Sequence, residues 1–181
     1  MTNGKFKALV HYIIHQFVDD PSKLGALRLN KALWFIDVIQ YQITGTPVTN
    51  EKYVKRKKGP VPKTILSTLE KLKSEKKIRI EEPKHQFDSR KLISEIEPKT
   101  NVFTEDELEL VKWCIDFVCG KTTNEISELT HDRIWEAAIE GEEIPLYATL
   151  VSERGIITEK TKKWADSVVK RIEKKKELEM A

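Results

Sequence analysis

Hydrophobic side chains recur every three or four residues through most of the chain, the spacing that places them on one face of an α-helix. The longest such stretch, residues 24–44, is apolar on most of its sides and is therefore expected in the centre of the domain. Residues 104–107 and 122–125 each read Thr-x-x-Glu, the capping box that opens a helix. Helices are expected over residues 5–18, 24–44, from a turn at 59–62 to about 74, 104–120, 122–129, 131–140, and from 158 onward.

Shorter segments alternate between apolar and polar residues, which is the period of a β-strand. Residues 78–81 and 92–96 flank a turn and predict a β-hairpin, and residues 48–55 predict a short extended piece. The predicted fold class is therefore mainly α with a small β-hairpin (α+β). Over residues 5–96 the order helix, helix, extended piece, helix and hairpin is that of a winged helix-turn-helix. Three or four helices are expected after it.

The domain organisation follows from length and from the absence of a linker. The chain has 181 residues, the length of one ordinary domain, and no internal repeat. Residues 1–155 predict a single compact domain, and residues 156–181 predict an appended amphipathic basic helix. Its apolar side chains, Trp164, Val168 and Ile172, are candidates for contact with a protein partner or with a second copy of the chain.

Charge is unevenly distributed although the net charge is only +3. Residues 51–80 hold 11 basic and 3 acidic side chains, whereas residues 104–155 hold 4 basic and 13 acidic ones. Such asymmetry indicates either a surface that binds a charged partner or two halves that face each other.

The basic stretch is the strongest physical signal for a partner. In a winged helix the polar face of the helix that follows it would meet DNA, with lysines and arginine on phosphates. The candidate DNA or acidic-partner contacts are Lys55, Arg56, Lys57, Lys58, Lys63 and Ser67. A solvated or partner-facing surface is the alternative, because one arginine and no Asn or Gln give little equipment for reading bases.

Catalytic and metal-binding patterns are weak. His11 and His15 have the i, i+4 spacing of a helical metal pair, but a third ligand is not evident, so two histidines bordering an apolar face are expected. His131 and Asp132 could do acid–base chemistry, although a histidine stacked on Trp135 is the simpler interpretation. We therefore predict no enzymatic activity and no cofactor.

The compartment is inferred from what the sequence lacks. Two cysteines cannot form a disulfide framework, the N-terminus has no signal-peptide core, and the longest apolar run is far too short for a membrane span. A cytoplasmic protein without membrane contact is expected.

Three motifs carry a resemblance to the Panacea domain, the SocA-like antitoxin family. The first lies within residues 28–41, where Lys31, Leu33, Trp34 and Phe35 resemble a Lys-Leu-Leu-Tyr-Phe-type helix. The second is Gly59-Pro60-Val61, which resembles a Gly-Pro-Val turn, and the third is Thr130-His131 followed by Trp135. The resemblance covers roughly residues 5–140.

The resemblance implies the antitoxin of a toxin–antitoxin pair that binds its cognate protein toxin directly, in one lineage as an adaptor that delivers the toxin to a protease. The family also includes phage-associated proteins. The matched residues Lys31, Trp34, Phe35, Gly59, Pro60, His131 and Trp135 are expected to shape the fold or a pocket. Since an unpaired buried ammonium is costly, Lys31 is expected to reach solvent or to pair with a carboxylate such as Asp132. A DNA-binding regulator of its own operon is the alternative function.

Overall fold

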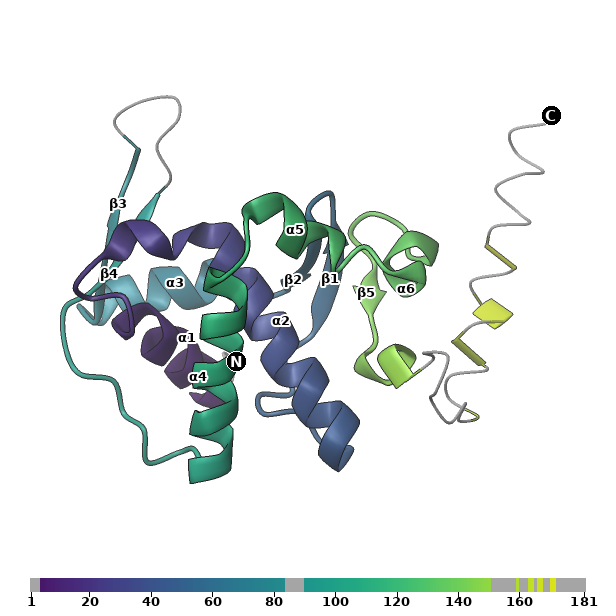
Figure 1. Cartoon of the computed structure of the whole chain (residues 1–181), viewed down its shortest axis with the longest axis horizontal. Coiled ribbons are helices and arrows are strands. Elements are labelled where there is room, and N and C mark those ends of the chain that lie inside the picture. Colours follow the sequence, from purple (N-terminus) through teal and green to yellow (C-terminus); the bar gives the residue numbers. More distant parts are fainter. Residues whose placement is uncertain are drawn as a thin grey trace.

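Figure 1 shows the computed structural model, which describes residues 4–83, residues 90–150 and seven helical residues between 159 and 171. Its α-helices are α1 (Gly4–His15), α2 (Gly25–Thr44), α3 (Ile65–Ser74), α4 (Glu105–Cys119), α5 (Thr123–Glu128) and α6 (Arg133–Ala137). Its strands are β1 (Tyr53–Arg56), β2 (Gly59–Pro62), β3 (Ile78–Glu81), β4 (Lys91–Ser94) and β5 (Glu143–Ile144), and its 3₁₀ helices are η1 (Pro21–Lys23) and η2 (Leu146–Leu150). The mainly α fold with small β-hairpins is confirmed.

The most apolar helix lies at the centre of the domain, as its sequence predicts. Helix α2 packs against α1, α4, α5, β2 and η2 (Figure 1). Its side chains Leu29, Leu33 and Ile36 are fully buried and belong to the same core as Phe6 and Ile13 of α1, which are fully buried too. Burial of this kind stabilises a domain by about 25 cal/mol for each Å² of apolar surface removed from water.

The segment expected to be a turn leading into a helix is a β-strand instead. Gly59–Pro62 pairs antiparallel with β1, and β5 adds a third strand on the other side, so the sheet order is β2-β1-β5. Two prolines in four residues argue against a strand in general, because proline donates no backbone hydrogen bond. Here β2 is an edge strand, and Pro60 and Pro62 stand at alternate positions whose backbone nitrogens point to its free side.

The second hairpin is the one that the sequence predicts. Strands β3 and β4 pair antiparallel with Ile78 opposite Ser94 and Ile80 opposite Leu92. Helix α3 precedes this hairpin and packs on α1 and β3, while β4 also contacts α1. The chain therefore keeps the predicted order up to residue 94, with a β1–β2 hairpin in place of the simple extended piece.

The predicted helix starts of the second half are present as capping boxes. The Thr104 hydroxyl accepts the amide of Glu107, whose carboxylate accepts the Thr104 amide at 3.0 Å. Thr122 and Glu125 make the same pair of bonds at the start of α5. Both cysteines are free thiols, and burial raises the pKa of Cys114 to about 12. Among the described helices, none combines the length and apolarity needed to cross a membrane.

Candidate functional site

The three sequence motifs meet at one place, although they are up to a hundred residues apart in the chain. Lys31 comes from α2, Gly59 from the start of β2, and Thr130 from the link between α5 and α6. The Lys31 ammonium donates to the carbonyl oxygen of Lys58 and to the hydroxyl oxygen of Thr130. The amine thereby joins the central helix, the β1–β2 turn and the α5–α6 link.

Lys31 is an ammonium buried among neutral oxygens. Its side chain is 1% exposed, and burial lowers its pKa to about 8, because a charged group is poorly solvated inside the protein. The prediction of a carboxylate partner for Lys31 is wrong, because in the described part of the chain its ammonium contacts no acidic side chain. Asp132 instead accepts the amide of Trp135 at 2.8 Å and caps α6.

Gly59 is required by both its backbone angle and the space around it. Its φ of +106° lies in a region that side chains rarely adopt. A Cβ atom there would fall onto the Lys31 amine and the Thr130 hydroxyl. The Gly-Pro-Val motif therefore marks the position where a backbone passes directly over a buried ammonium, and Pro60 follows as part of β2.

Trp34 and Tyr53 connect the first motif to the strand behind it. Their rings meet edge to face with centroids 5.0 Å apart. The Tyr53 hydroxyl lies 2.8 Å from both the Leu33 carbonyl and the Asp37 carboxylate. Asp37 is fully buried and also accepts the amide of Thr49 at 2.9 Å.

This buried carboxylate is a feature that our interpretation of the sequence missed. Burial raises the pKa of Asp37, while hydrogen bonds from Thr49 and Tyr53 partly offset that rise. The signal in the sequence was the one acidic residue of this long, mostly apolar helix, between Ile36 and Val38. Asp37 fixes the segment between α2 and β1, which sets the position of the β1–β2 hairpin.

His131 stacks on Trp135, the simpler of the two sequence interpretations. The rings are nearly parallel, with centroids 3.9 Å apart and an angle of 14°. Lys55 brings its amine to 4.1 Å from the indole centroid and donates to the Ala138 carbonyl at 3.0 Å. The indole N–H donates to the Arg56 carbonyl at 3.1 Å. These contacts attach α6 to β1, and in the described part of the chain His131 makes no hydrogen bond to Asp132.

The basic and acidic stretches of the sequence partly face each other. Lys52 pairs with Glu143 at 3.0 Å, and Arg56 lies 3.7 Å from Glu140. Lys52, Lys55 and Arg56 are therefore all held by the acidic segment that follows α6. The basic tract is therefore partly used inside the domain rather than offered to a partner.

The remaining candidate contacts are separated by the length of β2. Lys57 and Lys58 lie exposed in the β1–β2 turn, whereas Lys63 and Ser67 lie exposed at the start of α3. The Ser67 hydroxyl donates to the Thr64 carbonyl at 2.9 Å. No described carboxylate pairs with Lys57, Lys58 or Lys63, so their charges are free to act on an external partner.

The signature residue Phe35 and the tail residue Trp164 both pack inward. Phe35 is half-buried and meets Phe117 edge to face with centroids 5.4 Å apart. Trp164 is half-buried and packs against the core of the domain. Val168 and Ile172 lie outside the described residues.

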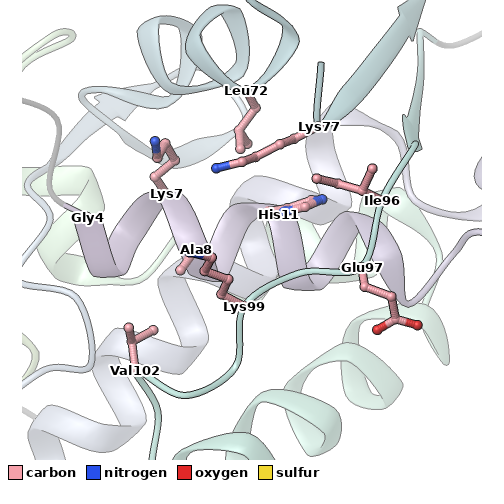
Figure 2. Close-up of a pocket in the computed structure, with 10 residues that line it drawn as sticks. All are labelled: Gly4, Lys7, Ala8, His11, Leu72, Lys77, Ile96, Glu97, Lys99 and Val102. Atoms are coloured by element: carbon pink, nitrogen blue, oxygen red, sulfur yellow. The ribbon is translucent and has the colours of Figure 1, made fainter. Parts of the chain in front are cut away.

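A groove runs along α1, apart from the motif residues. Its floor is Gly4, Lys7, Ala8 and His11, which share one face of the helix, and its volume is about 280 Å³ (Figure 2). His11 is buried, with its Nε2 3.2 Å from the Ser94 hydroxyl, and His15 places its Nδ1 3.1 Å from the same oxygen. Burial and the charge of Lys77 lower the pKa of His11. Within the described ranges, no three His, Cys, Asp or Glu side chains are arranged to hold a metal ion.

In a comparison with protein-family models, residues 29–136 match the family described as antitoxin SocA-like, Panacea domain. This range covers more than half of the chain and includes all three motifs that meet at Lys31. Searches of curated proteins and of solved structures gave no significant match.

Proposed function

Because the chain belongs to the SocA-like antitoxin family with the Panacea domain, we propose that it is the antitoxin of a toxin–antitoxin pair. It neutralises its cognate protein toxin by binding it directly and without catalysis, in the cytoplasm. The observation that carries the proposal is the family match over residues 29–136. The contacts of Lys31 with the β1–β2 turn and with Thr130 support it, because they give the matched motifs a common structural role.

Neutralisation can follow from blocking the toxin or from delivering it to a protease, and both require a stable complex. We test the complex first, by expressing the neighbouring gene in bacteria alone and together with this chain. Growth should stop when the neighbouring gene is expressed alone and should recover in the presence of the chain, and the two proteins should co-purify. If the neighbouring gene is harmless alone, or stays lethal beside the chain without co-purification, the proposal is wrong.

The toxin's lifetime separates the two mechanisms. A blocked toxin accumulates in the complex, whereas a delivered toxin falls in amount when the chain is present and recovers in cells that lack the relevant protease. Pulse–chase labelling of the toxin in wild-type and protease-deficient cells measures this directly. A phage origin of the gene pair would be visible in the flanking genes.

DNA binding is the second candidate function, and the free charges of Lys57, Lys58 and Lys63 favour it. Contacts with phosphates release counterions, so the affinity for the upstream DNA should fall steeply with salt. Replacing these three lysines by alanine should reduce the slope by about one for each lost phosphate contact. Lys55→Ala is the matched control, because this amine is already held by backbone carbonyls. Negligible binding at low salt in a gel shift removes this candidate.

A further inference from the structure

Helix α4 presents an exposed tryptophan on a rigid aromatic base. Trp113 is 54% exposed, although tryptophan is among the most hydrophobic side chains. Its ring stacks on Phe117 with centroids 5.2 Å apart and an angle of 11°, and Phe117 in turn meets Phe35 of α2. The indole is therefore held in place before any partner arrives, and tryptophans of this kind dominate the energy of many interfaces.

Three unpaired carboxylates lie beside this tryptophan, together with the exposed Lys112 of the same helix and with Lys121, whose amine lies 4.9 Å from the Phe117 ring centroid. Asp106, Glu109 and Asp116 are exposed and share a face of α4 with Trp113, at spacings of three and four residues. In the described part of the chain none of these three carboxylates forms an ion pair. Asp116 stands near the C-terminal end of the helix, where the helix dipole opposes a negative charge, so helix stability does not explain its presence.

Other acidic residues of the stretch 104–155 form ion pairs within the domain. Glu140 and Glu143 pair with Arg56 and Lys52 of the domain itself. The acidic excess of residues 104–155 is thus compensated internally near β5 and at Glu107 of α4, which pairs with Lys5 at 2.7 Å, whereas Asp106, Glu109 and Asp116 are left unpaired. A partner with basic side chains would supply the missing charge.

We propose that the exposed face of α4, formed by Asp106, Glu109, Trp113 and Asp116, is the surface on which a basic segment of the toxin docks. An arginine or lysine of that segment lies over the free face of the Trp113 ring as a cation–π pair, flanked by the three carboxylates. This inference rests on the proposed function and adds to it the chemistry of the partner surface.

The groove along α1 is the competing docking surface, and it predicts the opposite partner charge. Lys7, Lys77 and Lys99 line it, together with the exposed apolar side chains Ile96 and Val102 (Figure 2). Yet Lys7 and Lys77 are already bound to the carboxylate of Glu75 at 2.6 and 2.7 Å. These two hydrogen bonds lower the pKa of Glu75 to about 2. Two of the three lysines at this groove are therefore already paired, unlike the three carboxylates on α4.

The test measures the affinity of the full chain for the product of the neighbouring gene by calorimetry. Trp113→Ala should weaken binding by about thirty-fold or more, as expected for a central interface tryptophan. Trp113→Phe keeps a ring and should lose less. The double reversal Glu109→Lys with Asp116→Lys should weaken binding most at low salt, where screening is least.

Two control variants address surfaces that the proposal leaves out. Leu66→Ala removes another exposed apolar side chain, 70% exposed on α3, and Val102→Asp changes the charge at the groove; both should bind as the wild type does. Melting temperatures of all variants confirm that each is folded.

Each outcome decides between the proposals. If the wild type binds and the α4 variants bind equally well, the α4 surface is wrong while the antitoxin function stands. Loss of binding only with Val102→Asp assigns the toxin to the groove and also overturns the α4 surface. If the wild type sediments as a dimer that Trp113→Ala dissociates, a second copy covers α4, which again overturns it. A wild type that does not bind at all refutes the antitoxin proposal itself.

Discussion

Gly59→Ala is the most informative single substitution, because it places one carbon atom where three segments meet. The new Cβ would fall onto the Lys31 amine and the Thr130 hydroxyl, at a backbone φ of +106°. Lys31 is buried, so its amine cannot move to solvent to make room. Either the ammonium loses its two oxygen partners or the β1–β2 turn moves away from α2.

The expected loss of unfolding free energy has two parts. Forcing an alanine into a left-handed backbone region costs about 1–2 kcal/mol. Displacing a buried ammonium from its hydrogen-bond acceptors costs about 1.5–3 kcal/mol more, because hydrogen bonds to charged groups are the stronger ones. Gly59→Ala should therefore destabilise the protein by about 2.5–5 kcal/mol.

Gly45→Ala is a matched control within the same chain. Gly45 ends α2 with a φ of +75°, but a Cβ atom there would meet nothing within 4 Å. Its variant should lose only the backbone part, about 1–2 kcal/mol. Urea unfolding followed by circular dichroism measures both losses. If they agree within about 0.5 kcal/mol, which is the usual error of such comparisons, the close approach of Gly59 to Lys31 has no energetic consequence and our reasoning is wrong.

Three further substitutions test other parts of the fold. Burial lowers the pKa of Lys31 to about 8 from 10.5, so the unfolded state binds more protons between these values. The contribution of Lys31 to stability should rise over this pH range by at most about 3.4 kcal/mol. It is measured as the difference between the wild type and Lys31→Met in urea titrations, because the raised pKa of Cys114 lowers the stability of both proteins above about pH 9. Tyr53→Phe removes the hydroxyl that donates to the buried Asp37 carboxylate and should cost about 1.5–3 kcal/mol in thermal unfolding; an unchanged melting temperature would contradict this. Thr104→Ala removes the acceptor for the Glu107 amide and should cost about 1 kcal/mol by the same measurement.

The sequence predicts the helices well because their signals are local. Residues 24–44 show a continuous apolar pattern and form α2 from Gly25 to Thr44. The two Thr-x-x-Glu patterns place the starts of α4 and α5, since both partners of a capping box lie within one turn. The β3–β4 hairpin is predicted by alternation across one short turn.

The sheet and the surroundings of Lys31 could not be predicted in the same way, because they depend on distant residues. Strand β2 contains two prolines and is a strand only because β1 pairs with one of its edges. The partners of Lys31 are a backbone carbonyl and a hydroxyl from residues 58 and 130, and a carbonyl has no signature in the amino-acid type. The motifs pointed to the right residues, whereas a charge argument pointed to Asp132, which caps α6 instead.

Strand β5 shows that the folded unit extends beyond the residues of the family match. The family match stops at residue 136, yet Ile144 of β5 pairs with Tyr53 of β1, and Ala148 is fully buried beyond it. Strand β5 lies about ninety residues after β1, so on the ribosome β1 is synthesised long before its second neighbour. Pairing between such distant segments comes late in folding. A fragment cut at the family boundary would keep every motif residue and still expose an open strand edge, the kind of edge from which chains aggregate. Residues 143–150 thus belong to any fragment that is meant to stay folded and monodisperse.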